Sequence, residues 1–461
     1  MSVPPRSRGA IRLQAQGSYI TRALRLPAQN FVHTEQVGGI VLLLAAVVAL
    51  VWVNSPWDES YHDLWSTVLS LDVWLFEVTE NLEEWVNDGL MALFFFVVGL
   101  EIKREMLHGE LSTRKKAALP IFAALGGMIV PAGIYAAFNA GGEGADGWGI
   151  PMATDIAFAL GVLALLGRRL PSELRILLLG LAVVDDLGSI LVIAIFYTDS
   201  LSLSHLGMAV GLLAGIGVAA RLGIRNLAFY AVVGTFVWVA VLKSGVHATV
   251  AGVALGLMTP ATAYYTKAAF AEKADSLMQD YHRALEDDDS DKADVLLGEM
   301  EELAGGTESP LERLERLFHP WTAFLVLPVF ALANAGIPLS GSILSDAASE
   351  AVTIGVFAGL LAGKVLGIST ACWLGVHFGL AVLPNGVRWS HVIGVSILGA
   401  IGFTVAIFIA GLALDDPGTV DRAKIGILSA SVISGVAGYL FLRFISTQPD
   451  LPTLPEDGPV L

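Results

Sequence analysis

Long apolar runs recur along this chain, and they leave few folds open to it. The first run, GGIVLLLAAVVALVWV, occupies residues 38–53. A helix of about 20 such residues crosses a hydrocarbon core roughly 30 Å thick. The 461 residues are 55% hydrophobic and only 15% charged, too few charges for a water-soluble domain of this size. A transmembrane β-barrel would show short alternating segments instead. The sequence therefore predicts an all-α polytopic membrane protein.

The apolar runs predict twelve transmembrane helices. Clusters of Lys and Arg follow the second, fourth and sixth of them, and Arg443 ends the twelfth, whereas the loops at 55–82, 139–150 and 339–351 contain neither residue type. Because cytoplasmic loops carry the excess of positive charge, both termini are predicted to be cytoplasmic. The predicted helices lie near residues 36–54, 83–106, 117–138, 150–167, 172–197, 203–220, 224–242, 245–260, 319–338, 352–378, 389–413 and 424–445.

Polar segments divide the chain into five predicted regions. A basic cytoplasmic arm at 1–34 precedes helices one to eight at 35–260. An acidic cytoplasmic insertion at 261–316 separates these from helices nine to twelve at 317–446, and a cytoplasmic tail occupies 447–461. The insertion contains the run ALEDDDSDKADVLLGEMEEL. It is either a helical pair or partly disordered, and a solvated acidic segment is favoured over a specific binding site.

The outer loop at 55–82 is rich in Trp and acidic residues. It includes the alternating run LDVWLFEV at 71–78, a pattern typical of a β-hairpin. The edge of such a hairpin could pair with a second protomer. The alternative is an aromatic anchor at the membrane surface.

Charge and cysteine content exclude several classes of function. The formal net charge of −16 argues against nucleic-acid binding. The single cysteine, Cys372, excludes an internal disulfide framework and a cysteine-rich metal site.

Two predicted helices are interrupted, one in each half of the chain. The fourth opens with GIPMATDIAFALG, in which Pro151 and Thr154 disturb the helix, and the eleventh contains GAIGFTVAIF, in which Gly399 and Gly402 loosen it. Paired interrupted helices in the two halves of a transporter mark a substrate site near the membrane midplane.

Four charged residues lie within predicted transmembrane helices. Asp185 and Asp186 are adjacent in LAVVDDLGSILVI, Asp155 lies at the predicted break, and Lys364 lies mid-span in GLLAGKVLGIST. A charge at the centre of a lone helix costs at least about 2.5–3.5 kcal/mol, so such residues are candidate functional residues. Adjacent helical residues point about 100° apart, which lets one aspartate face a cavity while the other pairs with Lys364. The alternative, charges that only hold helices together, is a poor route to stability.

These side chains suit a small, hard cation. Carboxylates, the Thr154 hydroxyl and freed backbone carbonyls are all oxygen ligands. A buried aspartate that binds either a proton or a cation couples the two fluxes, provided that the site opens to one side at a time. For Asp155 two roles remain equally open: cation binding, or balancing the positive N-terminal ends of two half-helices. Lys364 could balance the facing C-terminal ends in the same way.

Other polar residues carry less weight. Glu101, Arg104 and Glu105 end the second predicted helix with spacings that place them near one another. They are either ordinary interfacial charges or an acidic cytoplasmic mouth that attracts cations and responds to pH. His247, in SGVHATVAGV, is interpreted as a packed core histidine rather than a ligand.

The sequence resembles the NhaA family of sodium/proton antiporters over about residues 30–260 and 318–445. Six runs follow the family pattern in its usual order, which makes the signal specific. They are NDGLMALFFFVVGLEIKREM, PMATDIAFALGVLALLG, LAVVDDLGSILVIAIFY, SGVHATVAGV, HPWTAFLVLPVFALANAGI and AIGFTVAIFIAGLAL.

The resemblance implies a multi-pass protein of the bacterial inner membrane, with twelve helices, inverted repeats and two interrupted helices crossing near the midplane. It implies electrogenic export of cytoplasmic Na+ or Li+ against a larger number of external protons, with no cofactor. It assigns Asp186 as the main cation ligand and proton carrier, beside Asp185, which pairs with Lys364. Thr154 and Asp155 then lie at the crossing. The resemblance also links Glu101, Arg104, Glu105, His247 and Glu315 to pH activation, and implies a homodimer formed through the outer hairpin.

Two departures from the family pattern and three alternative functions accompany the resemblance. The 261–316 insertion is longer and more acidic than the family's short loop. Ala400 and Ala406 offer no hydroxyl, so ligation from the eleventh predicted helix must come from Thr404 or the backbone. A sodium-coupled symporter or a cation channel could use the same fold. An intramembrane aspartyl enzyme is disfavoured because DDLGS lacks a GxGD pattern, and no enzymatic activity is expected.

Overall fold

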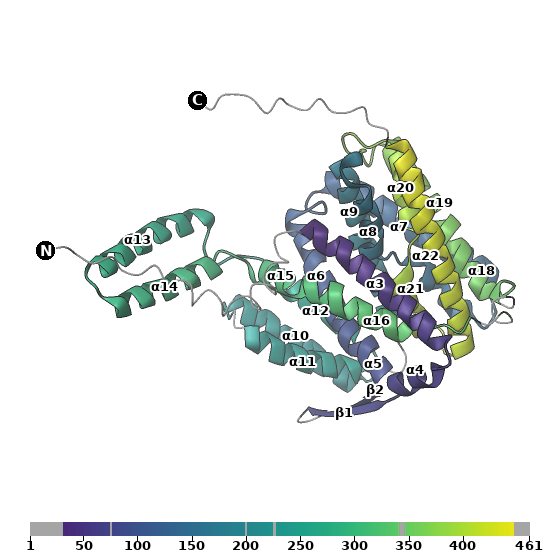
Figure 1. Cartoon of the computed structure of the whole chain (residues 1–461), viewed down its shortest axis with the longest axis horizontal. Coiled ribbons are helices and arrows are strands. Elements are labelled where there is room, and N and C mark those ends of the chain that lie inside the picture. The colour runs from purple at the N-terminus through teal and green to yellow at the C-terminus, as the bar shows by residue number, and fades with distance from the viewer. Residues whose placement is uncertain are drawn as a thin grey trace.

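The computed structural model describes residues 31–73, 76–198, 201–224, 227–339, 341, 345 and 347–446, and it is overwhelmingly helical. Figure 1 shows the long helices packed side by side, with the pair α13–α14 extending away from them. Residues 1–30 of the predicted arm and the whole predicted tail at 447–461 lie outside the described residues. The predicted all-α architecture is confirmed.

Every predicted transmembrane helix overlaps a helical segment of the structure. Within the described residues, eight helical segments are long and apolar enough to cross a membrane, or up to ten if two bent pairs each count as one crossing. Two shorter apolar helices, Ala228–Leu242 and Thr249–Met258, correspond to the predicted seventh and eighth. The count of twelve crossings stays a prediction. The eight segments are Leu82–His108, Arg114–Asn139, Ala145–Leu165, Ser172–Phe196, Leu203–Arg221, Pro310–Asn334, Ala351–His377 and Pro417–Ile445.

Several of these segments combine more than one kind of helix. Three contain short π-helical stretches, in which the backbone winds more loosely than in an α-helix. Their parts are α5 (Leu82–Glu84), η3 (Trp85–Leu90) and α6 (Met91–His108); α15 (Pro310–Trp321), η6 (Thr322–Val326) and α16 (Leu327–Asn334); and α18 (Ala351–Ala358), η7 (Gly359–Gly363) and α19 (Lys364–His377). The uninterrupted helices are α3 (Phe31–Val53), α7 (Arg114–Asn139), α9 (Ser172–Phe196), α10 (Leu203–Arg221), α11 (Leu227–Leu242), α12 (Thr249–Met258) and α22 (Pro417–Ile445).

Two helices of the structure begin before the transmembrane runs that the sequence predicts, because caps, not apolar runs, decide where these helices begin. The ninth predicted helix began at 319 and the insertion ended at 316, but α15 starts at Pro310. Ser309 caps it, and Glu312 completes a reciprocal capping box. The twelfth was predicted from 424, but α22 starts at Pro417, where the Asp416 carboxylate accepts a hydrogen bond from the Thr419 N–H.

Two seams of small residues bring helix backbones into close contact. A Cβ added to Gly252 of α12 would lie 2.1 Å from the Ala92 carbonyl oxygen of α6, and one added to Gly126 of α7 would lie 2.1 Å from the Gly367 oxygen of α19. Small residues at helix interfaces are the usual device of membrane bundles. The largest apolar core joins α3, α6, α7, α9 and the helices after residue 326, while α10, α11 and α12 share a smaller one.

The outer loop forms the predicted β-hairpin. Strands β1 (Val68–Val73) and β2 (Phe76–Asn81) pair antiparallel, with Val68 opposite Asn81. The hairpin follows the short helix α4 (Asp58–Trp65), whose Tyr61 hydroxyl donates to the Ala333 carbonyl oxygen at 2.7 Å. This bond attaches α4, the helix that precedes the hairpin, to the end of α16.

The acidic insertion forms a helical pair, the first of the two predicted forms. Helices α13 (Lys267–Glu286) and α14 (Ser290–Gly305) pack through their own small apolar cluster, which includes Ala284, Ala293 and Leu296. The ends of the pair meet where the N–H groups of Tyr264 and Tyr265 both donate to the Gly306 oxygen, at 2.8 and 3.0 Å. The helical pair therefore packs on itself, and the two chain segments that connect it to the rest of the protein lie next to each other.

Candidate cation and proton site

Two helix breaks meet at the centre of the bundle. The first separates the 3₁₀ helix η4 (Ala145–Met152) from α8 (Ile156–Leu165), and the second separates α20 (Trp389–Leu398) from α21 (Phe403–Ala413), with a bend of 50°. The Asp155 N–H donates to the Ile401 oxygen at 2.7 Å, and the Thr154 hydroxyl donates to the Gly399 oxygen at 2.8 Å. Each break thus satisfies backbone groups of the other, which a membrane interior requires.

Asp155 caps two half-helices at once. One carboxylate oxygen accepts from the Phe158 N–H of α8 at 2.9 Å. The other accepts from the N–H and the hydroxyl of Thr404 on α21, at 3.1 and 2.6 Å. An anion at two helix N-termini is stabilised by their exposed N–H groups and dipoles. This geometry is that of the charge-balancing role, one of the two roles left open for Asp155.

Lys364 is fully buried beside Asp185. Its Nζ lies 2.6 Å from Asp185 Oδ2, donates to the Thr154 hydroxyl at 3.0 Å, and donates to the Met152 carbonyl oxygen at the end of η4. All three interactions neutralise or satisfy an otherwise costly buried ammonium group. The structure therefore pairs Lys364 with Asp185 rather than with Asp186, and also sets it against a helix C-terminus.

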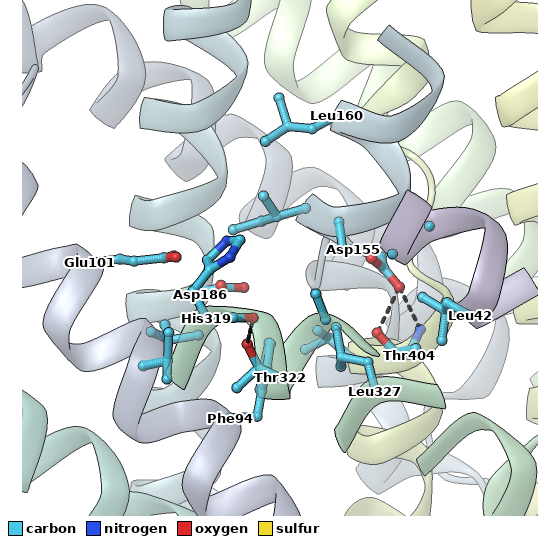
Figure 2. A pocket seen from close by; sticks show the side chains of 18 of the residues that line it. Leu42, Phe94, Glu101, Asp155, Leu160, Asp186, His319, Thr322, Leu327 and Thr404 are labelled. Atoms are coloured by element: carbon cyan, nitrogen blue, oxygen red, sulfur yellow. Dashed lines mark hydrogen bonds between the residues drawn. The ribbon is translucent and has the colours of Figure 1, made fainter. Parts of the chain in front are cut away.

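Asp186 has a different environment from its neighbour. Its side chain is 1% exposed, and neither of its carboxylate oxygens has a hydrogen-bond partner in the described structure. It lines a cavity of about 80 Å³, together with Asp155 and Thr404, which is room for a few water molecules. Figure 2 shows Asp155 and Thr404 on one side of this pocket and Asp186 with Glu101 on the other.

The structure brings four of the five pH-response candidates together. Arg104 of α6 forms an ion pair with Glu315 of α15, and its Nη2 lies 3.4 Å from Glu105. Glu101 and Arg104 also line the cavity that contains Asp186. This charged cluster therefore adjoins the candidate site.

His247 does not belong to that cluster. It precedes α12, whose other end contacts Lys103 of α6, and its Nε2 lies 2.5 Å from the Tyr197 oxygen at the end of α9. The ring therefore bridges α9 and the start of α12, as a packed histidine would.

Sequence reasoning did not single out the histidine that lines the cavity, and it gave too little weight to Thr404. His319 lines the cavity from α15, but it appeared only as part of the run HPWTAFLVLPVFALANAGI. Thr404 was noted as an available hydroxyl, yet its bond to Asp155 depends on the meeting of two breaks. Neither the position of His319 at the cavity nor the bond between Thr404 and Asp155 can be predicted from the residues next to them in the sequence.

No three His, Cys, Asp or Glu side chains gather into a cluster that could hold a metal ion, within the part of the chain that the structure describes. A cation beside Asp185 and Asp186 would therefore take its remaining ligands from hydroxyl, carbonyl or water oxygens. Oxygen ligands of this kind suit a small, hard cation. Paired helix breaks beside an unpartnered buried carboxylate define a class of protein, the helical secondary transporters of small cations.

Comparison with known proteins narrows the class to a family. The family model described as Na+/H+ antiporter 1 matches residues 29–442, and the chain belongs to this family of transporters, which are not enzymes. It is 47% identical to the Na(+)/H(+) antiporter NhaA of Oleidesulfovibrio alaskensis over 92% of this chain and 94% of the relative. It is also 47% identical to that of Rhodopirellula baltica over 93% and 96%, and 45% identical to NhaA 2 of Sorangium cellulosum over 92% and 91%.

Proposed function

We propose that this protein is an electrogenic antiporter that exports cytoplasmic Na+ or Li+ in exchange for external protons. The observation that carries the proposal is the carboxylate of Asp186, buried without a partner on the wall of a cavity. Such a group is costly to leave both charged and empty. A proton or a cation neutralises it, and the two compete, so that each release of one accompanies binding of the other.

The ion pair between Asp185 and Lys364 adds a second competition, between the cation and the lysine. A cation that approaches Asp185 competes with the Lys364 ammonium group for the same carboxylate. Asp155 and Thr154, at the crossing of the breaks, bind the cation or hold the half-helices in place. An excess of protons over cations in each cycle lets the membrane potential drive export, at about 2.3 kcal/mol per charge per 100 mV.

The protein resides in a bacterial inner membrane with both termini in the cytoplasm. The basic loops after the second, fourth and sixth helices support this orientation. The module α13–α14 is then cytoplasmic, because it lies on the side of the Arg104–Glu315 pair, and the β-hairpin lies on the outer side.

The cluster of Glu101, Arg104, Glu105 and Glu315 makes exchange dependent on cytoplasmic pH. Its ion pairs connect α6 to α15 directly beside the cavity. Protonation of a carboxylate there weakens that connection. His247 lies at the opposite end of α12 from this cluster.

The protein forms a homodimer through the hairpin β1–β2. Among the described residues, the two strands pair only with each other, so each presents an outer edge that a second copy can extend.

Everted membrane vesicles with an acid interior and a ΔpH-sensitive dye test the exchange. Added NaCl or LiCl should release the proton gradient in wild-type vesicles but not in Asp186→Asn vesicles. Asp275→Asn, on the exposed surface of α13, is the matched control and should behave as wild type. Exchange that persists in a folded Asp186→Asn protein would refute the site. Wild-type vesicles in which no cation releases protons would favour a symporter or a channel.

A further inference from the structure

One turn of α9 holds most of the buried polar atoms that have no partner. Six buried side-chain N or O atoms lack a hydrogen bond in the described part of the chain, and four of them lie between Asp185 and Ser189. They are Asp185 Oδ1, both Asp186 oxygens and Ser189 Oγ. Because buried polar atoms are normally hydrogen-bonded, this concentration indicates a place where a ligand completes the bonding.

The Ser189 hydroxyl is unusual among the helical hydroxyls of this protein. The buried Ser396 of α20 donates to the carbonyl oxygen four residues earlier, at 2.8 Å, as hydroxyls in helices commonly do. Ser189 is 1% exposed and makes no such bond. Its donor and its lone pairs are therefore available inside the protein.

Helix geometry sets Ser189 between the two aspartates. At 100° per residue, its side chain projects roughly 40° from that of Asp185 and roughly 60° from that of Asp186, on the arc between them. Residues three and four apart have Cβ atoms about 5–6 Å from one another. Ser189 thus lies one turn further along α9 than the aspartates. Its side chain points between the direction of Asp185, which pairs with Lys364, and the direction of Asp186, which lines the cavity.

We propose that Ser189 Oγ is a further oxygen ligand of the transported cation and favours Na+ over Li+. The proposal rests on the proposed exchange at Asp186. A hydroxyl is a neutral, hard oxygen donor, and selectivity among hard cations depends on the number of ligands and the size of their cavity. Na+ is the larger ion and gains from an additional ligand, whereas Li+ completes its coordination shell with fewer.

Ser189→Ala tests the proposal in everted vesicles. The Na+ concentration for half-maximal proton release should rise about threefold or more, as expected when one hydrogen-bond-strength contact is lost. The Li+ value should change much less. Ser189→Thr keeps the hydroxyl and should retain the wild-type preference. Ser434→Ala is the matched control: among the described residues Ser434 Oγ is also buried without a partner, but it lies on α22, whereas Ser189 shares one turn of α9 with both aspartates.

Thermal unfolding of the purified protein gives a readout that needs no transport. Without Na+, Ser189→Ala should raise the Tm, because the change removes an unsatisfied buried hydroxyl and places a better helix former there. The further rise in Tm on adding NaCl should be smaller than in wild type, because a bound ligand stabilises in proportion to its affinity.

Two results would overturn the inference. One is a Ser189→Ala protein with wild-type Na+ and Li+ concentrations for half-maximal release. The other is a Ser189→Ala protein whose Tm responds to NaCl as the wild type does. Failure of the proposed exchange is seen separately, in wild-type vesicles or in Asp186→Asn, and the NaCl effect on Tm still decides the role of Ser189.

Discussion

Lys364 and Asp185 show how two buried charges depend on each other. Both side chains are 0% exposed, and the lysine has no other anionic partner within hydrogen-bond distance in the described structure. Taking either charge out of water is expensive, and their attraction offsets that cost only while both are present.

Replacing Lys364 alone should therefore be more harmful than replacing both members of the pair. Lys364→Met is expected to destabilise the protein by about 3 kcal/mol, because it leaves Asp185 buried and unpaired. The double variant Asp185→Asn with Lys364→Met should recover most of that loss. Thermal unfolding of the purified variants measures both effects. A double variant no more stable than the single one would show that the pair is not the origin of the loss.

Thr404 couples the two half-helices through one side chain. Thr404→Val keeps the backbone N–H bond to Asp155 but removes the 2.6 Å hydroxyl bond. The loss of a hydrogen bond to a buried carboxylate is expected to cost about 1–3 kcal/mol. Thr404→Ser should lose much less, since it retains the hydroxyl. Equal thermal stability of the two variants would contradict the contact.

At the scale of elements, close backbone contact fixes how the helices pair. Gly252→Ala on α12 sets a methyl group 2.1 Å from the Ala92 oxygen, so α6 and α12 must separate. We expect a loss of more than about 2 kcal/mol, or loss of folded protein. The control is Gly298→Ala on α14, which meets nothing within 4 Å and should be neutral or stabilising by about 0.5–1 kcal/mol. Similar yields and Tm values for the two variants would argue against close backbone contact between α6 and α12.

The cap of α22 gives a pH dependence of known sign. Hydrogen bonds from the Thr419 hydroxyl and N–H lower the pKa of Asp416. A carboxyl whose pKa is lower in the folded state stabilises that state above its unfolded pKa, and the contribution is lost as the pH falls through the folded value. The Tm difference between wild type and Asp416→Ala should therefore shrink below about pH 4. A difference that does not change between pH 3 and pH 7 would exclude this cap as its source.

On the scale of the whole molecule, the acidic module is separable from the bundle. It has its own apolar cluster, and its ends are joined by backbone hydrogen bonds at Tyr264, Tyr265 and Gly306. Replacing residues 267–305 by two or three glycines should preserve Na+-dependent proton release, although its pH dependence can shift. This cut leaves Ser309 to cap α15. A folded deletion protein without any exchange would show that the module takes part in transport.

The sequence by itself determined the class of fold, the helical segments and the charged residues inside the membrane, because hydrophobic period and the cost of buried charge are local properties. It also indicated both helix breaks and the hairpin, which depend on nearby Pro, Gly and alternating residues. Two helices start at Pro310 and Pro417, before the apolar runs predicted near 319 and 424, because caps set where these helices begin.

Only the tertiary structure decided which carboxylate does what. Adjacent aspartates look alike in a sequence, but α7 packs against both α19 and α9, and in this arrangement Lys364 forms its ion pair with Asp185 while Asp186 faces the cavity. The bond between Thr404 and Asp155 joins residues 249 positions apart, and His247 lies at the far end of α12 from the charged cluster. Such contacts depend on how distant helices meet, which no local pattern of residues encodes.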